Sequence, residues 1–209
     1  MVTRLTLIRH AHAASNGEYG LLSGRTDAQL TERGHDEIIR LRARLREHEP
    51  FAAIYSSPSR RAYETATALA AAGLGPVRVC QTLQEIDCGE LDGLPLAEVR
   101  NRYPALWAAN ARHDDDRFRW PGGESYREFR CRCLRVVHAI ALAHRGGRIA
   151  LVTHAGVITQ VLGALHGAGA ARWDLYRPAN TALTEIEWRH GTATVLAFDD
   201  RAHLDPDAR

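Results

Sequence analysis

The chain has 209 residues, of which 45% are hydrophobic and 25% charged, a composition typical of globular proteins. A chain of this length folds without disulfides or a structural metal, so its four cysteines are interpreted as reduced thiols. A formal net charge of +2 is too small to indicate nucleic-acid binding, and the N-terminal apolar run is too short to span a membrane. We therefore expect a single cytoplasmic domain over 1–209, with no nucleic-acid or membrane partner.

In the first half of the chain, the apolar pattern predicts strands that alternate with helices. In chain order these are a strand at 3–8, a loop at 11–29, a helix from 31 to 50, a strand at 51–55, a helix from 58 to 72 and a strand at 77–80. Thr31 is the expected N-cap of the first helix, and Pro58 is expected to open the second. The loop is long enough to indicate a functional role.

Region 85–125 interrupts this alternation. The elements from there on are short helices near 95–102 and 104–112, a helix from 125 to 144, a strand at 148–153, a helix at 156–166 and strands at 181–188 and 192–198. Alternating strands and helices predict an α/β fold, a three-layer sandwich with helices on both faces of a mainly parallel sheet. Region 85–125 is then an insertion over the active-site edge, where it forms a substrate wall. An exposed edge strand near 192–198 leaves a homodimer open.

Charged side chains follow several of the predicted strands at the point where each strand ends. Arg9 and His10 follow the first strand, and Arg60 and Arg61 come soon after the second. His154 follows the most apolar strand. The carboxyl ends of strands in open α/β sheets are where ligands bind, so the chain order brings these groups together. An arginine beside a histidine is hard to explain by packing, because arginine is almost never fully buried unpaired. Runs of arginine at 40–46 and 127–135 are interpreted as solvated helix faces.

Blocks of residues spread in order over nearly the whole chain carry a more specific signal. They lie at 9–16, 24–27, 30–34, 56–66, 85–93, 121–125 and 152–156. Together they resemble the histidine phosphatase superfamily, also called phosphoglycerate-mutase-like, in its branch of small phosphatases. Agreement at so many spaced blocks is far more specific than a single motif.

The resemblance implies a metal-independent and cofactor-independent phosphomonoesterase that acts on a small soluble ester through a phosphohistidine intermediate. His10 is implied as the nucleophile and Glu85 as the proton donor. The full implied catalytic set is His10, Glu85, Arg9, Arg61 and His154. The implied substrate ligands are Arg9, Asn16, Gly24, Arg61 and His154. Arg61 is chosen over Arg60 because the family places its arginine directly before Ala62.

Each of these residue types suits phosphoryl transfer on physical grounds. The transition state spreads charge over three equatorial oxygens, which guanidinium groups can bind in a bidentate manner. His10 must attack as a neutral imidazole, and neighbouring arginines lower its pKa. Glu85 must be protonated, which burial favours by raising its pKa. His154, facing the bound anion, is expected to be a charged donor.

Several positions depart from the family pattern. Ala11 replaces a usual Gly and Ala155 replaces another, and both changes are small. Ala13 replaces Thr or Ser, so one hydroxyl contact is expected to be missing from the pocket. His12 stands where Glu or Gln is usual, and no role is assigned to it.

Three alternatives stay open. A cofactor-dependent phosphoglycerate mutase is disfavoured, because Ile86 and Cys88 stand at positions where the mutases of the family have Arg and Tyr. A metal-dependent hydrolase would use His10 and His12 as ligands, but cations such as the nearby arginines repel a metal. A non-catalytic binding member is the third. The sequence does not identify the physiological substrate. The candidate contacts between the substrate wall and the leaving group are Tyr19, Leu21, Leu22, Trp107 and Trp120.

Overall fold

The computed structural model describes residues 1–16, 20–189 and 191–204. Its framework is a six-stranded sheet with the order β3-β2-β4-β1-β5-β6. The strands are β1 (Val2–Arg9), β2 (Ala53–Ser56), β3 (Val77–Val79), β4 (Arg148–Thr153), β5 (Leu183–Arg189) and β6 (Thr192–Asp200). The pairings among β1 to β4 are parallel, whereas β5 and β6 add two antiparallel pairings at one side. The prediction of a mainly parallel α/β sheet is confirmed.

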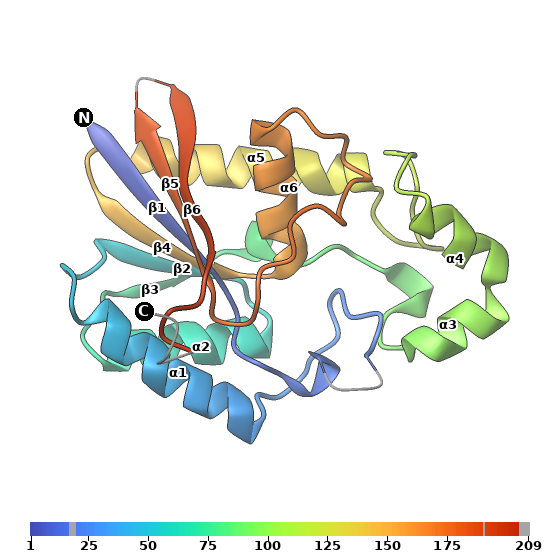
Figure 1. Ribbon diagram of the computed structural model, residues 1–209, viewed down its shortest axis with the longest axis horizontal. Helices are drawn as coiled ribbons and strands as arrows, with labels where there is room; N and C mark the ends of the chain where they lie inside the picture. Colours follow the sequence, from blue (N-terminus) through green and yellow to red (C-terminus); the bar gives the residue numbers. More distant parts are fainter. Residues whose placement is uncertain (17–19, 190, 205–209) are drawn as a thin grey trace.

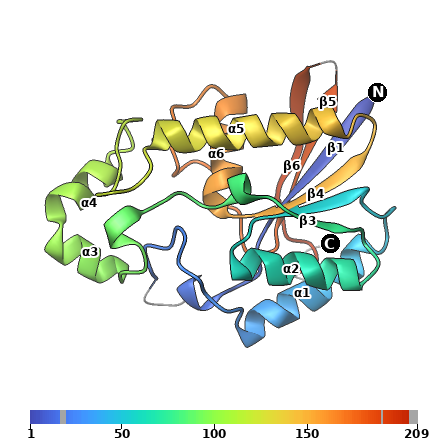
Figure 2. The same cartoon turned by 180° about the vertical axis from the view of Figure 1, so that it is seen from behind.

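Helices cover both faces of this sheet. They are α1 (Glu32–Leu45), α2 (Arg60–Ala71), α3 (Leu96–Arg102), α4 (Pro104–Ala111), α5 (Tyr126–Ala143) and α6 (Ala155–Leu165), with short 3₁₀ turns at η1 (Ala14–Asn16), η2 (Gln81–Leu83) and η3 (Gly89–Leu91). Figures 1 and 2 show α1 and α2 on one face of the sheet and α5 and α6 on the other. The small helices α3 and α4 lie beyond the end of the sheet (Figure 1). These layers confirm the three-layer sandwich.

The central strands read as continuous apolar runs because both of their faces are buried. Side chains alternate between the faces with a period of two. Leu5 and Leu7 of β1 pack with α5 and α6, whereas Ile8 packs with α1 and α2. In β4, Leu151 and Val152 likewise belong to opposite layers. The strands therefore hold fixed positions, and their carboxyl ends form a rigid edge.

The start of α2 differs from the prediction that Pro58 opens it. The helix begins at Arg60 with Ser59 as N-cap, so Pro58 lies outside the helix. The cause is that the Ser57 N–H still donates to the Val152 carbonyl, at 3.0 Å, as in a sheet hydrogen bond. The extended backbone therefore continues beyond the end of β2. A residue before proline also favours extended backbone, which delays the helical turn. The predicted cap of α1 is confirmed, since the Thr31 hydroxyl accepts from the Gly34 N–H in the first turn of that helix.

The 85–125 region contains a small apolar cluster of its own. Its buried members are Cys88, Leu91, Val99, Phe118, Trp120, Tyr126, Ala170 and Ala171. Ala170 and Ala171, in the segment after α6, contribute to this cluster and connect the region to the sheet layers. A single domain over 1–209 stays our prediction. The four cysteines are free. Within the described ranges, no helix is long and apolar enough to cross a membrane.

Candidate active site

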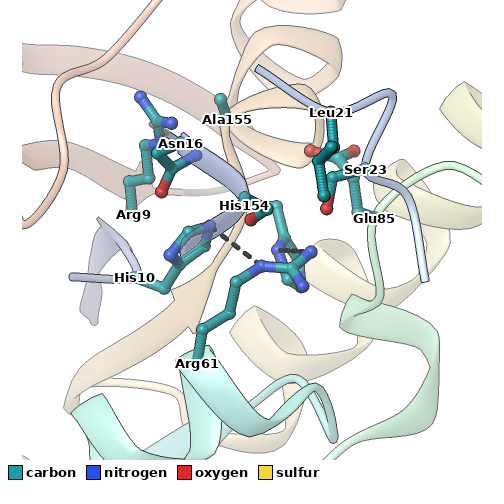
Figure 3. A pocket seen from close by; sticks show the side chains of 10 residues that line it. Arg9, His10, Asn16, Leu21, Ser23, Arg61, Glu85, His154 and Ala155 are labelled. Atoms are coloured by element: carbon teal, nitrogen blue, oxygen red, sulfur yellow. Dashed lines mark hydrogen bonds between the residues drawn. The ribbon is translucent and has the colours of Figure 1, made fainter. Parts of the chain in front are cut away.

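A cavity of about 120 Å³ lies at the carboxyl edge of the parallel strands (Figure 3). It is lined by Arg9, His10, Ser15, Asn16, Leu21, Ser23, Arg61, Glu85, His154 and Ala155. These side chains come from the end of β1, the loop after it, the first turn of α2, the segment after η2 and the start of α6. The structure therefore brings all the predicted catalytic residues and Asn16 together.

The ring of His10 is held in one tautomer. Its Nδ1 lies 2.8 Å from the Ala11 carbonyl oxygen. A carbonyl can only accept a hydrogen bond, so Nδ1 carries the proton and Nε2 keeps its lone pair. Burial lowers the pKa of His10 well below the usual range, and Arg61 and Arg9 lower it further. The side chain is 3% exposed. His10 is therefore a neutral imidazole whose lone pair lies on Nε2.

Arg61 lies at the centre of the site and is almost fully buried. Its Nε donates to Nε2 of His10 at 3.1 Å, and its Nη2 lies 3.3 Å from Nδ1 of His154 (Figure 3). The guanidinium group is oriented by two backbone carbonyls, that of Thr26 at 2.7 Å from Nη1 and that of Gly24 at 3.0 Å from Nη2. A planar fork held at both ends suits an anion placed beside the nucleophile.

Asp92 holds the loop that supplies these carbonyls, and sequence reasoning missed it. Its carboxylate accepts from the backbone N–H groups of Gly24 (2.9 Å) and Arg25 (2.6 Å) and from the Thr26 hydroxyl (2.6 Å). A Cβ at Gly24 would meet the Ile86 carbonyl oxygen at 2.0 Å, so only glycine fits there. Gly24 is not among the lining residues of the cavity, and its role as a direct substrate ligand stays a prediction.

Arg9 enters the cavity from the end of β1. Its Nη1 donates to the Pro178 carbonyl at 2.8 Å. Its Nε is buried and has no hydrogen-bond partner among the described residues. Buried guanidinium donors are normally paired, so an unpaired one at a cavity indicates a place for an anion.

His154 is tied at both ring nitrogens. Since Arg61 donates to Nδ1, the proton lies on Nε2, which donates to the Ser57 hydroxyl at 2.8 Å. Burial lowers the pKa of His154 well below the usual range, and Arg61 and His10 add to this effect. Desolvation therefore favours the neutral ring in the protein without an anion, and the charged donor expected beside a bound anion stays a prediction. A phosphate dianion beside the ring would act in the opposite direction.

Glu85 lies on the other side of the cavity from His10 (Figure 3). Its two carboxyl oxygens accept from the backbone N–H groups of Ile86 and Gly156, both at 2.9 Å. These two bonds lower its pKa, but burial outweighs them and raises the pKa above the usual range. The predicted direction is confirmed. The carboxyl group is thus fixed in position while its protonated form is favoured.

Asn16 is oriented by a second residue that sequence reasoning missed, Asn180. The Oδ1 of Asn16 accepts from the Ala13 N–H at 3.1 Å and from Nδ2 of Asn180 at 3.3 Å, which leaves its own amide N–H groups for the cavity. Asn180 also donates to the His10 carbonyl at 2.8 Å. Thr181, next in the chain, has φ 56°, a left-handed conformation that costs about 1–3 kcal/mol in a β-branched residue.

The departures from the family pattern have local consequences. Ala13 lacks a hydroxyl, but Ser15 and Ser23 both line the cavity, so the pocket still contains hydroxyl groups. The ring of His12 contacts the Thr31 hydroxyl at 2.9 Å and does not line the cavity with His10. Over residues 1–16, 20–189 and 191–204, no group of three or more His, Cys, Asp or Glu side chains could hold a metal ion.

The predicted wall contacts separate into two groups. Leu21 lines the cavity. Leu22, Trp107 and Trp120 pack in the apolar cluster of the 85–125 region and do not line the cavity, and the substrate wall stays a prediction. Tyr19 lies outside the described residues.

The fold and the cavity define a class, an α/β protein with a buried cationic pocket suited to a phosphate ester. The histidine phosphatase superfamily (branch 1) matches residues 5–201. Metal-independent phosphoserine phosphatase of Arabidopsis thaliana is 28% identical, over 97% of this chain and 84% of its own. Phosphoglycerate mutase-like protein 4 of the same plant is 32% identical, over 96% and 86%. The solved structure of Bacillus stearothermophilus YhfR is 31% identical, with a TM-score of 0.86 over 97% and 100% of the two chains.

The chain belongs to the histidine phosphatase superfamily. It is a phosphomonoesterase, a hydrolase of small phosphate esters.

Proposed function

We propose that the protein hydrolyses a small, soluble phosphomonoester through a phosphohistidine on Nε2 of His10, without a metal or a cofactor. The single observation that supports this most is the tautomer of His10. Its Nδ1 donates to the Ala11 carbonyl, so the lone pair lies on Nε2 inside a cavity that Arg61 and Arg9 make cationic. Arg61 donates to this lone pair in the structure and turns to the phosphate before Nε2 attacks.

In the first step, Nε2 attacks phosphorus while the bond from phosphorus to the alcohol oxygen breaks. Arg9, Arg61, Asn16 and His154 bind the phosphoryl oxygens, where each charge-assisted hydrogen bond contributes about 1.5–3 kcal/mol. Glu85 gives its proton to the departing alkoxide, which is the role that its raised pKa supports.

In the second step, water attacks the phosphohistidine from the side that the alcohol has left. Glu85, now a carboxylate, takes a proton from this water, and the bond from Nε2 to phosphorus breaks. Inorganic phosphate leaves, His10 is again neutral and Glu85 is again protonated. Protons and charge therefore balance over the cycle without a further group.

A phosphoglycerate mutase is the alternative within the family, and a relative carries that description. A mutase needs groups that hold a substrate carboxylate while the phosphoryl group moves between hydroxyls. Ile86 and Cys88 stand at the positions where the family's mutases have Arg and Tyr. Cys88 is 2% exposed and lies within an apolar cluster. We expect no isomerisation of 3-phosphoglycerate in the presence of 2,3-bisphosphoglycerate.

The substrate is proposed only as a class. Relatives are described as phosphatases of phosphoserine and of glucosyl-3-phosphoglycerate, which are small phosphate esters. A cytoplasmic location and the absence of nucleic-acid and membrane partners remain our predictions. A homodimer through β6 also remains one, since this edge strand exposes Leu196 and Phe198.

The test is to trap the phosphoenzyme. The protein is mixed with a radiolabelled phosphomonoester in the presence of a chelator, quenched and separated by gel electrophoresis. We expect an acid-labile, base-stable label that is lost in His10→Ala and kept in His12→Ala, a matched control whose ring does not line the cavity. Absence of label and of turnover in the unmodified protein would support a non-catalytic binding member. Loss of turnover on chelation would support a metal-dependent hydrolase.

A further inference from the structure

Arg132 of α5 belongs to an arginine run that the sequence indicated to be a solvated helix face, and this interpretation is wrong for it. Its side chain is 18% exposed and points toward the segment that carries Glu85. Arg130 is also partly buried, where it binds Gln160 and the carbonyls of Ala168 and Gly169. The helix buries these two guanidinium groups because each satisfies backbone carbonyls that have no strand or helix to pair with.

All five N–H donors of Arg132 are used. Nη1 donates to the carbonyls of Thr82 and Gln84, both at 2.8 Å. Nη2 donates to the Glu85 carbonyl at 3.2 Å and to Oε2 of Glu124 at 2.7 Å, and Nε donates to Oε1 of Glu124 at 3.0 Å. The guanidinium group thus joins three carbonyls of one short segment to a carboxylate in a planar, bidentate pair.

This arrangement matters because Glu85 lies in irregular backbone. The segment 84–88 lies between η2 and η3 and pairs with no strand. The carboxyl group of Glu85 bonds the N–H groups of Ile86 and Gly156, so its place depends on where the 84–86 backbone lies relative to α6. Glu124 balances the charge of Arg132, which lets a cation hold this backbone without strongly favouring ionised Glu85.

We propose that Arg132, paired with Glu124, is a positioning residue that sets the Glu85 carboxyl where it can protonate the leaving alcohol. The inference rests on the proposed role of Glu85 as the acid. Arg132 itself touches neither the substrate nor the cavity. Its effect is therefore expected on proton transfer to the leaving group and not on phosphate binding.

Leaving-group dependence separates these two effects. An alkyl phosphate releases a strongly basic alkoxide that needs a proton, whereas p-nitrophenyl phosphate releases a stable phenolate that does not. The ratio kcat/KM reports the steps through alcohol release, so later attack of water does not mask the result. In Arg132→Met, we expect kcat/KM to fall about 10–100-fold for glycerol phosphate, since a misplacement of about 1 Å costs on that order. For p-nitrophenyl phosphate we expect a fall of less than about threefold.

Arg130→Met is the matched control, because it removes another hydrogen-bonded, partly buried arginine from the same helix without touching 82–85. We expect it to lower the thermal midpoint while the ratio of the two kcat/KM values stays at its original level. Arg132→Lys and Glu124→Gln are milder variants that are used if Arg132→Met does not fold, and both are expected to show the same selective loss on glycerol phosphate.

Glu85→Gln is the reference for the proposed function. A selective loss in Glu85→Gln together with equal losses on both esters in the Arg132 variants would overturn the inference and leave the role of Glu85 intact. No selective loss in Glu85→Gln would overturn that role itself. The pH profile is a second readout, since a displaced carboxyl moves the alkaline limb of kcat/KM for glycerol phosphate.

Discussion

Gly156 allows the sharpest test of how closely Glu85 must be placed. A Cβ at position 156 would lie 2.2 Å from Oε1 of Glu85, whereas ordinary contact begins at 3.4 Å. In Gly156→Ala the carboxyl oxygen must therefore move by about 1.2 Å, and a displacement of about 1 Å costs about 100-fold in rate. We expect kcat/KM for an alkyl phosphate to fall by about 100-fold, or about 2.7 kcal/mol of transition-state stabilisation.

The assay is steady-state release of inorganic phosphate, with circular dichroism to follow folding. Glu85→Asp shortens the acid by one methylene, so the double variant Gly156→Ala with Glu85→Asp should regain part of the loss that Gly156→Ala causes. Gly163→Ala is the control in the same helix, where the new Cβ meets Nη2 of Arg130 at 3.0 Å and Cβ of Ala168 at 3.9 Å, and no atom of Glu85. Unchanged kcat/KM in Gly156→Ala, or no relief in the double variant, would refute the reasoning.

The remaining predictions concern anion binding and acid stability. Asp92→Asn removes the carboxylate that holds the loop whose carbonyls orient Arg61. We expect the inhibition constant of inorganic phosphate to rise about tenfold. An unchanged constant would contradict this. Burial lowers the folded-state pKa of His10 and His154. Below about pH 6.5 the unfolded chain therefore binds more protons than the folded protein. The free energy of unfolding should then fall with decreasing pH, by up to about 1.4 kcal/mol per pH unit for each histidine. Urea unfolding between pH 7 and pH 5 measures this slope, and a flat profile would refute it.

The clustering of the proposed catalytic residues could be predicted from the sequence, because the ends of strands can be recognised in it. Apolar periodicity marks where β1 and β4 stop, and the carboxyl ends of parallel strands share one edge, so Arg9, His10 and His154 had to lie close together. Arg61 follows from the same logic at the start of α2. The family resemblance added Glu85, which sits in irregular backbone where no periodicity could identify it.

The supporting residues could not be predicted in this way. Asp92, Asn180 and Arg132 act on backbone groups far from them in the chain, and no local pattern tells which carbonyl or N–H a polar side chain binds. The lowered pKa of His154 without an anion depends on its complete burial beside Arg61, which a strand-end position does not reveal. The sequence did not tell whether Trp120 contacts the substrate or packs in a core. Its 2% exposure shows that it packs in a core.

Asn180 and Thr181 also bear on how the protein matures on the ribosome. The Asn180 amide binds the His10 carbonyl and the Thr181 N–H binds the Arg9 carbonyl at 2.9 Å. Every proposed catalytic residue has been synthesised once His154 is in place, yet the backbone that carries the nucleophile is still without these two contacts. Phosphatase activity should therefore arise only once 180–181 are folded in place, and chains that stop before Asn180 would lack both of these contacts to the backbone of Arg9 and His10.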